Sequence, residues 1–438
     1  MSLTRQCVLI VSSLAFCVGT LHADDWPQWR GNGRDAKLSQ SEQLQSLPSG
    51  EITRKWTIPL GPGYSGPTVA DGLVYVTDHG ARDADGEPID QGEVERVICV
   101  DRRDGSLVWQ HVYDAPYTIQ YRAGPRAAVT VTDGVALAVG AMGHLHCLDA
   151  KTGAVRWKHD LNAEYKINMP IWGITASPLV HNGWVIQIVG GSNGSCVVAF
   201  DLETGAERWR SIDERAGYSS PVIVRQADQE VLVCWSGESL SGLDPETGKT
   251  HWRIEMLPRN MPIGVPTPIV QDDLVFVSSF YDGSLLVRLD SQKLDATTVW
   301  RRIGVDEKNT DALHCMISNP FFKGDHIYGV DSYGQLRCLS LDNGDRVWES
   351  DQAVQRNRWA TVHTIQNGDR EIMLNEQGEL IDATVSPSGF TLHSRGFLIS
   401  PTKLQLPRRD GVVWSHPAIS NGEIFARNDA ELICAPLR

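Results

Sequence analysis

Short hydrophobic runs alternate with turn residues along almost the whole chain and return at a nearly constant spacing. The phrase LHCLDAKTGAVRW at residues 145–157 shows the unit. Apolar and polar residues alternate up to Asp149, a turn that contains Gly153 follows, and a second run ends at Trp157. Alternation with a period of two is typical of a strand with one buried face. The phrase therefore predicts a β-hairpin that carries a tryptophan on its returning strand.

Close variants of this phrase occur four more times. We expect the aspartate to accept hydrogen bonds from the turn, the glycine to adopt the left-handed conformation, and the tryptophan to fill the space beside the next sheet. These structural positions are Asp101, Gly105 and Trp109; Asp149, Gly153 and Trp157; Asp201, Gly205 and Trp209; Asp244, Gly248 and Trp252; and, where Ser340 replaces the aspartate, Gly344 and Trp348.

Three weaker copies bring the number of units to eight. Trp300 follows a longer turn, the copy at 379–393 lacks its tryptophan, and the strand at 432–435 has no turn or tryptophan after it. The missing half of that last unit stands near the other end, around Trp56. A period of roughly 45–50 residues made of short strands is typical of a β-propeller. We predict an all-β, eight-bladed propeller with four antiparallel strands per blade, whose last blade is closed by the N- and C-terminal strands.

The first residues read as a secretory signal peptide at 1–23. Arg5 supplies the positive charge, 8–18 the apolar core, and Ala23 a small residue for cleavage. An uncleaved anchor is the alternative, but the apolar stretch is shorter than the roughly 20 residues that span a bilayer. The bulky residue before Cys17 argues against a lipid anchor there. We expect a periplasmic or secreted protein with no transmembrane segment after cleavage.

Two further regions follow. Residues 24–50 form an N-terminal arm in which Trp26 and Trp29 stand among proline and glycine, and we expect both indoles to pack on the propeller. Residues 51–438 form the propeller itself. The formal net charge of −14 argues against nucleic-acid binding. We expect a monomer.

Familiar catalytic and metal-binding motifs are absent from the sequence. Cys99, Cys147, Cys338 and Cys434 occupy equivalent places in different blades, which indicates a packing position. His144 and His146 share a strand face and could contact a metal, although a polar strand face is the simpler interpretation. We therefore assign no catalytic or metal-binding residue.

Chemically varied residues stand just before the first strand of each blade. In propellers these segments gather at one end of the channel, so they predict a polar, aromatic-lined binding site at its mouth. The alternative is that the loops are solvated or fill the channel. The candidates are Tyr64, Arg122, Arg126, Trp172, Tyr218, His314, Asn319, Arg358, Trp359 and His416.

The repeated phrase resembles that of the pyrroloquinoline-quinone (PQQ) quinoprotein propellers, and 145–157, 197–209 and 240–252 are nearly its consensus. The segment WPQWRG at 26–31 is similar to the start of exported PQQ-like proteins of planctomycete type. The resemblance implies one of two branches. One branch contains PQQ-dependent dehydrogenases with calcium; the other contains BamB-type scaffolds of the cell envelope.

Departures from the dehydrogenase pattern favour the second branch. The chain has no pair of adjacent cysteines and is short for such an enzyme, and no calcium ligands can be matched. We expect a non-catalytic scaffold or binding protein without a cofactor, with a protein partner or small polar ligand at one face. The alternative is a PQQ-dependent alcohol or sugar dehydrogenase, with the quinone stacked on Trp172 or Trp359 and its carboxylates on Arg122 or Arg358.

Overall fold

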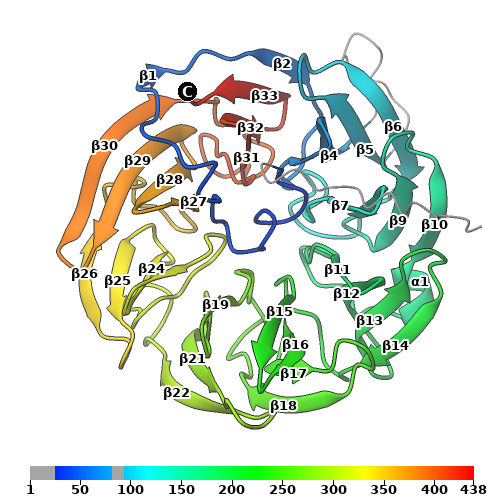
Figure 1. Ribbon diagram of the computed structural model, residues 1–438, viewed down its shortest axis with the longest axis vertical. Coiled ribbons are helices and arrows are strands. Elements are labelled where there is room, and N and C mark those ends of the chain that lie inside the picture. Colours follow the sequence, from blue (N-terminus) through cyan, green and yellow to red (C-terminus); the bar gives the residue numbers. More distant parts are fainter. Residues whose placement is uncertain (1–24, 81–92) are drawn as a thin grey trace, which may run out of the picture.

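Eight antiparallel sheets radiate from a central axis in the computed structural model, which describes residues 25–80 and 93–438 (Figure 1). Seven sheets have four strands in sequence order, and one of these gains a fifth strand at its outer edge; the eighth takes its outer strand from the N-terminal part of the chain. The prediction of an all-β, eight-bladed propeller is confirmed. The signal peptide predicted at 1–23 lies outside the described residues.

Within each blade the strands follow one another along the chain from the inner edge to the outer edge. The first three complete blades are β3 (Thr68–Ala70), β4 (Leu73–His79), β5 (Val94–Asp101) and β6 (Leu107–Asp114); β7 (Thr130–Thr132), β8 (Val135–Val139), β9 (His144–Asp149) and β10 (Val155–Asp160); and β11 (Leu179–His181), β12 (Trp184–Gly191), β13 (Ser195–Asp201) and β14 (Glu207–Ser211). The next three are β15 (Val222–Gln226), β16 (Gln229–Trp235), β17 (Ser239–Leu243) and β18 (Thr250–Glu255); β19 (Ile269–Gln271), β20 (Leu274–Ser279), β21 (Gly283–Leu289) and β22 (Ala296–Arg302); and β23 (Phe321–Lys323), β24 (His326–Val330), β25 (Leu336–Ser340) and β26 (Arg346–Ser350).

The last two blades both recruit residues from the N-terminal part of the chain. One is β27 (Val362–Asn367), β28 (Arg370–Asn375), β29 (Glu379–Ser386) and β30 (Gly389–Phe397), with β1 (Gly50–Glu51) added in parallel to β30. The other is β31 (Ala418–Ser420), β32 (Glu423–Arg427), β33 (Glu431–Pro436) and β2 (Trp56–Pro59). In this closing blade Trp56 lies opposite Cys434, and the residue after it lies opposite Ile433. The predicted closure by the two chain ends is therefore confirmed.

The repeated turn has the chemistry that its sequence predicts. Asp149 accepts hydrogen bonds from the backbone N–H groups of Lys151 and Thr152, and Gly153 has a φ of +72°. The pairing of β9 with β10 shifts register just beyond this turn, which marks a bulge. The Arg156 guanidinium and the Thr152 hydroxyl lower the pKa of Asp149 to about 2. The turn aspartate is thus an ionised acceptor near neutral pH.

The repeated tryptophans connect each blade to the next. The indole N–H of Trp109 donates to the carbonyl oxygen of Ala150 at 2.9 Å, and that of Trp157 donates to Leu202 at 2.9 Å. Each acceptor follows the turn aspartate of the neighbouring blade. The same relation holds for Trp56, Trp209 and Trp300, with Ser340 in the aspartate position for Trp300.

The turn glycines make room for these rings. An added Cβ at Gly153 would lie 2.6 Å from the Trp109 ring, and one at Gly205 would lie 2.7 Å from the Trp157 ring. Each glycine therefore serves two purposes: it takes a positive φ, and it leaves the space that the indole of the preceding blade occupies.

Trp252 departs from this rule because the next blade has the longer turn before Trp300. Its indole N–H donates instead to the side-chain oxygen of Gln226 at 3.0 Å. The amide nitrogen of Gln226 donates in turn to backbone carbonyl oxygens of that turn, at Asp290 and Asp295. A glutamine bridge thus replaces the direct contact.

The hydrophobic core lies between blades rather than inside any one of them. Among the described residues, six buried clusters each take side chains from two adjacent blades, and the largest joins three blades with the N-terminal arm. For example, Val135 and Leu137 of β8 pack in one cluster with Val185 of β12 and Phe200 of β13. A blade that buries its faces only against its neighbours is stable only within the ring.

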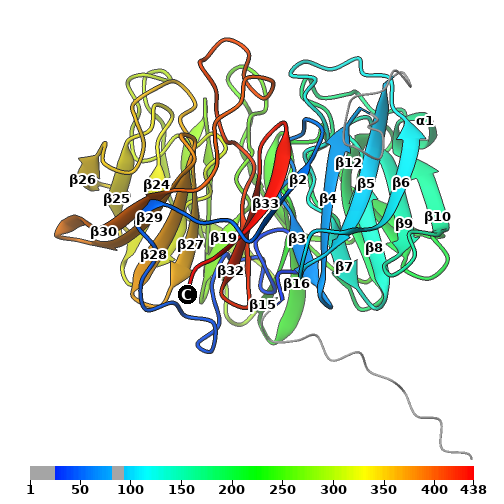
Figure 2. The same cartoon turned by 90° about the horizontal axis from the view of Figure 1, so that it is seen from above.

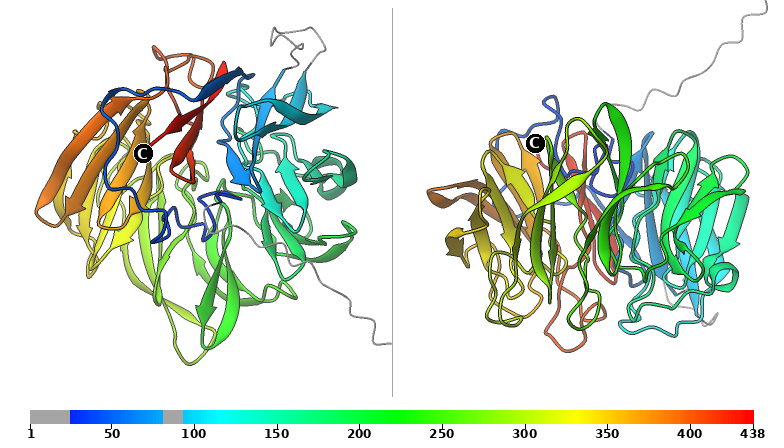
Figure 3. Two further views of the ribbon diagram at one scale, coloured as in Figure 1. Left: turned by 45° about the horizontal axis from the view of Figure 1, so that its top comes forward. Right: turned by 90° about the horizontal axis from the view of Figure 1, so that it is seen from below.

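The N-terminal arm crosses the centre of the ring before it joins the outer edge. Trp26 pairs with Val69 through backbone hydrogen bonds, and Lys37 pairs with Gln366. In Figures 1 and 3 the arm, drawn in dark blue, passes over one end of the channel, whereas the long 398–417 connection projects from the opposite face, as Figure 2 also shows. The N-terminal arm therefore fills one end of the channel.

One short helix was not expected from the pattern. α1 (Leu161–Tyr165) begins where the Asp160 carboxylate accepts a hydrogen bond from the Ala163 N–H at 3.0 Å, an N-cap contact. Across residues 25–80 and 93–438, no helix has the length and apolar character needed to cross a membrane.

The contact between turn glycine and indole can be tested by alanine substitution. Gly205→Ala should lower the free energy of unfolding more than Gly183→Ala does. Both glycines have similar positive φ values of +73° and +78°, but the space around Gly183 is open and that around Gly205 is occupied by Trp157. Backbone strain of about 1–2 kcal/mol is common to both variants. Urea denaturation should show an additional loss of about 1–3 kcal/mol for Gly205→Ala, and equal losses would mean that the ring contact does not constrain the turn.

Buried histidines should make the ring less stable in mild acid. Burial lowers the pKa of His146 to about 3, of His363 to about 4 and of His416 to about 3, from an ordinary value of 6.5. Between pH 6.5 and these values the unfolded chain binds protons that the native chain does not. The free energy of unfolding should therefore fall as pH falls, by up to about 1.4 kcal/mol per pH unit for each imidazole.

The variant His416→Gln removes one of these titrating imidazoles. The His416 Nε2 atom accepts the Gly66 N–H at 3.1 Å, across the junction of the last and first blades. Glutamine can also accept this bond, but it does not titrate. Denaturation at pH 7 and pH 5 should show a shallower pH dependence for this variant, and an unchanged dependence would contradict the assignment.

Candidate functional site

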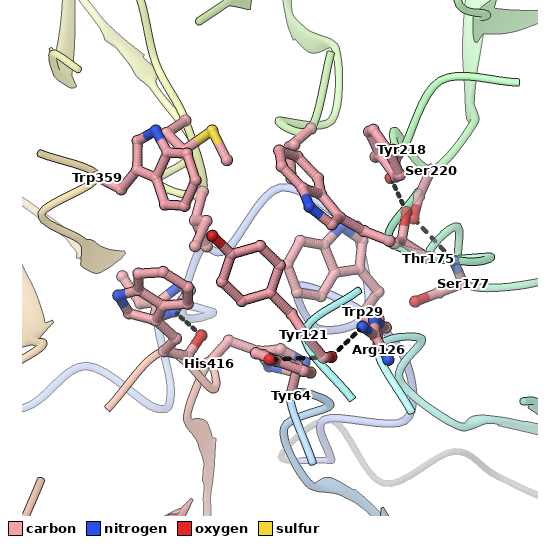
Figure 4. A pocket seen from close by; sticks show the side chains of 16 residues that line it. Trp29, Tyr64, Tyr121, Arg126, Thr175, Ser177, Tyr218, Ser220, Trp359 and His416 are labelled. Atoms are coloured by element: carbon pink, nitrogen blue, oxygen red, sulfur yellow. Dashed lines mark hydrogen bonds between the residues drawn. The ribbon is translucent and has the colours of Figure 1, made fainter. Parts of the chain in front are cut away.

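Six of the ten candidate residues line one cavity at the channel. They are Tyr64, Arg126, Trp172, Tyr218, Trp359 and His416, which come from six different blade junctions. The cavity has a volume of about 140 Å³. Figure 4 shows these side chains arranged around a common space. Its other lining residues are Trp29, Tyr121, Thr175, Ser177, Ser220, Val265, Met316, Ile317, His363 and Trp414.

Hydrogen bonds between neighbouring blades hold the segments that line the cavity. The backbone N–H of Ala128 donates to the Ser177 hydroxyl at 2.9 Å, and the N–H of Ser177 donates to the Ser220 hydroxyl at 2.9 Å. The Gly66 N–H makes the corresponding bond to His416. Each blade therefore positions the residue that its neighbour contributes, and the wall is built by the ring as a whole.

Trp29 of the N-terminal arm forms part of the wall. Its indole N–H donates to the Thr267 hydroxyl at 2.7 Å, and its ring meets that of His416 edge to face at 4.5 Å. Arg34, further along the arm, donates to the carbonyl oxygens of Ser177 and Pro178. The arm is thus fixed to the channel on several sides.

Aromatic rings make up most of the wall. Trp172 lies 5.0 Å from Tyr218 and 6.0 Å from Trp359, centroid to centroid, and Tyr121 touches both tryptophans. The indole N–H groups of Trp172 and Trp359 are buried and meet no acceptor in the described part of the protein. An unpaired buried donor is costly, so each of these groups would gain from an acceptor brought within hydrogen-bond distance.

Arg126 supplies the positive charge of the wall. Its guanidinium lies over the Tyr64 ring at 4.7 Å and donates to the backbone carbonyl oxygens of Gly124, Gln120 and Tyr121. The described residues that line the cavity include no aspartate or glutamate.

Burial keeps two histidines and one tyrosine of the wall neutral near pH 7. Burial lowers the pKa of His363 to about 4 and that of His416 to about 3, and it raises the pKa of Tyr218 to about 12. His363 donates from Nε2 to the Trp414 carbonyl oxygen at 2.8 Å. The wall is therefore apolar and aromatic, with a single positive charge.

The other four candidate residues do not line this cavity. Arg122 is exposed and forms an ion pair with Glu93. His314 is buried as a structural group: its Nε2 accepts the Gly304 N–H at 3.0 Å, and its Nδ1 donates to the Phe280 carbonyl oxygen.

The remaining two stand close to the cavity without lining it. Asn319 accepts the Thr267 N–H at 2.8 Å and lines a smaller cavity beneath Trp29. Arg358 forms a two-point ion pair with Glu307, at 2.8 and 2.7 Å, and its guanidinium covers the Trp359 ring at 4.5 Å. Arg358 therefore supports the wall from behind.

Sequence reasoning did not assign Trp29 to the site. The residue stands in the arm, outside the repeat, so no strand spacing indicates which part of the ring it meets. The hydroxyl groups of Ser177 and Ser220 also went unassigned, because small residues near a strand start carry no distinctive signal.

The histidines on β9 give no metal site. The rings of His111 and His146 lie 4.8 Å apart, with Tyr113 against both. Among residues 25–80 and 93–438, no three His, Cys, Asp or Glu side chains are grouped so that they could hold a metal ion. The seven cysteines of these ranges are buried and unpaired.

Known proteins similar to this chain fall in both expected branches. Solved structures with the same fold include BamB from Moraxella catarrhalis, at 17% identity and a TM-score of 0.57, covering 88% of this chain and 98% of that one. They also include quinohemoprotein alcohol dehydrogenase ADHIIG from Pseudomonas putida HK5, at 15% identity and a TM-score of 0.59, covering 95% and 80%. A europium-containing methanol dehydrogenase has 13% identity and a TM-score of 0.60, covering 92% and 90%.

No curated protein sequence matches the chain. A family model described as outer membrane protein assembly factor BamB matches it in three overlapping stretches, residues 49–221, 93–350 and 193–392. Together these stretches span most of the ring, and they include seven of the repeated tryptophans. The chain belongs to the PQQ-repeat β-propeller family that this model describes.

Proposed function

We propose that the protein is an exported, non-catalytic binding or scaffold protein of the cell envelope, which binds its partner at the face where the aromatic cavity lies. The observation that carries this proposal is the character of the cavity: among the described lining residues, an aromatic wall with one arginine and no carboxylate, over a channel whose other end is crossed by the N-terminal arm. Such a wall offers contact area and hydrogen-bond donors, but no carboxylate among those residues to act as a base.

The loops around the cavity support an interaction surface. Exposed apolar side chains occur on the connections that lead from the outer strand of one blade to the inner strand of the next. Val305 is 83% exposed, and Leu257 and Leu404 are each 53% exposed. All these connections lie on the same face because every blade repeats one strand order. Apolar side chains exposed on one face of a ring are available for contact with another protein.

The dehydrogenase alternative has the support of fold similarity alone. PQQ is a planar quinone with several carboxylates, and its chemistry requires a base beside the substrate. The two arginines expected to bind those carboxylates are committed elsewhere, Arg122 to Glu93 and Arg358 to Glu307. Arg126 is the sole cation among the described lining residues. These residues do not fit the cofactor, so we derive no catalytic step through it.

A titration with PQQ separates the two functions. The protein is mixed with PQQ and Ca²⁺, and quinone absorbance and dye reduction with alcohols or sugars are followed. We expect no change in absorbance and no dye reduction, because the described lining residues include one arginine for the several carboxylates of PQQ and no carboxylate base. Stoichiometric PQQ binding together with substrate-dependent dye reduction would establish the dehydrogenase instead.

A capture experiment tests the interaction surface. The double variant Val305→Asp, Leu404→Asp should retain at least about tenfold less of the envelope proteins that the immobilised wild-type protein retains, because burying an uncompensated carboxylate at an interface is costly. The matched control is Leu107→Asp, Leu392→Asp, which changes residues with 59% and 44% exposure on outer strands β6 and β30. The control should retain the wild-type set. Equal capture by both variants would exclude the cavity face as the interface.

A further inference from the structure

We infer that the cavity binds a small carboxylate with an apolar body, either a free aromatic acid or the terminal residue of a peptide chain. This inference rests on the proposed binding function and names the ligand class of the same site. The argument has three parts: the charge of the wall, its unpaired donors and its shape.

The first part is an uncompensated positive charge. Arg126 lines the cavity, and its side-chain partners are backbone carbonyl oxygens and the Tyr64 ring. The Nε–H and one Nη1–H are left over from these bonds. Arg408 is exposed and does not line the cavity, although its guanidinium lies 4.1 Å from the Trp359 ring. Within the described ranges, neither arginine has a carboxylate at ion-pair distance, whereas the nearby Arg358 and Arg409 do.

The second part is the pair of unsatisfied indole donors. Trp359 is 6% exposed, and its Nε1 atom, like that of Trp172, is buried without an acceptor. The two tryptophans lie on neighbouring sides of the wall, with ring centroids 6.0 Å apart. Acceptor oxygens of a ligand that came within reach would pair with these donors, and a negative charge on it would pair with the Arg126 guanidinium. An ammonium group would meet the same guanidinium, and the described lining residues offer it no carboxylate.

The third part is the apolar remainder of the wall. Tyr121, Trp414 and Met316 offer flat or flexible apolar surface, and the hydroxyl oxygens of Ser177 and Ser220 each accept a backbone N–H group. The body of the ligand therefore contacts mainly carbon atoms. The cavity of about 140 Å³ limits this body to a small ring or one side chain. A ligand with several carboxylates would not find enough cations in this wall to pair with each of them.

The test compares a carboxylate with its neutral amide on the unchanged protein. 3-Phenylpropionate and 3-phenylpropanamide have the same ring and chain length and differ in charge. Binding is measured by calorimetry and by the fluorescence of the tryptophans that line the cavity. We expect the acid to bind at least about tenfold more tightly than the amide, since a charge-assisted hydrogen bond is worth about 1.4 kcal/mol or more.

Two variants place the effect at one residue. Arg126→Gln should weaken binding of the acid at least about tenfold and leave that of the amide nearly unchanged. Arg122→Gln is the matched control, because Arg122 lies on the same connection but pairs with Glu93 outside the cavity. The control should bind the acid like the wild-type protein. Equal binding of acid and amide by the wild-type protein, or binding of neither, would overturn the inference without recourse to any variant.

A short peptide that ends in phenylalanine, with its C-terminus free or amidated, distinguishes the two sources of the carboxylate. Preference for the free peptide over 3-phenylpropionate would identify a chain terminus as the ligand, and the reverse would identify a free acid. The result for acid binding can also be distinguished from the result that tests the proposed function. Acid binding without face-dependent capture of envelope proteins would refute the scaffold role alone, and capture without acid binding would refute this inference alone.

Discussion

The contact between each repeated tryptophan and the turn of the next blade is the constraint on which the rest of the ring depends. The indole needs a carbonyl oxygen to receive its N–H and an open space for its ring, and the turn of the following blade provides both. Aspartate orders the turn, glycine leaves the space, and the residue after aspartate presents the acceptor. Three positions that look like a local hairpin motif are therefore a joint between two sheets. Where the receiving turn is longer, a glutamine restores the same connection.

This joint explains why the fold was predictable from the sequence. Strand alternation, the turn and the tryptophan all recur, and each agrees with the same architecture. Even the closing blade could be predicted. The last strand of the chain has no turn and no tryptophan strand after it, and the strand around Trp56 has a tryptophan but no repeat before it, so each supplies what the other lacks. The parallel strand β1 and the helix α1 escaped prediction. Neither belongs to the repeat, and each depends on a local contact such as the Asp160 cap.

The site was predictable only in part, for a physical reason. The ring fixes the position of each segment that precedes an inner strand. Six of the ten site residues predicted from the sequence therefore meet at one cavity. The ring does not fix which way a side chain turns when a competing partner is present. Arg358 turns to Glu307, and His314 turns to two backbone groups, both at positions that repeat spacing cannot distinguish from those of the wall. Trp29 lies outside the repeat altogether. A family with one fold and several roles thus keeps its differences in residues that the repeat leaves free.

The pairing of β2 with β33 has a consequence for how the protein is made. Residues 56–59 emerge early in synthesis, yet their partner strand spans 431–436. The first and last blades bury apolar surface against each other only after that late strand has been synthesised. The nascent polypeptide therefore carries seven consecutive sheets as an open arc, and the toroid closes when residues 431–436 reach the strand that was made about 370 residues earlier.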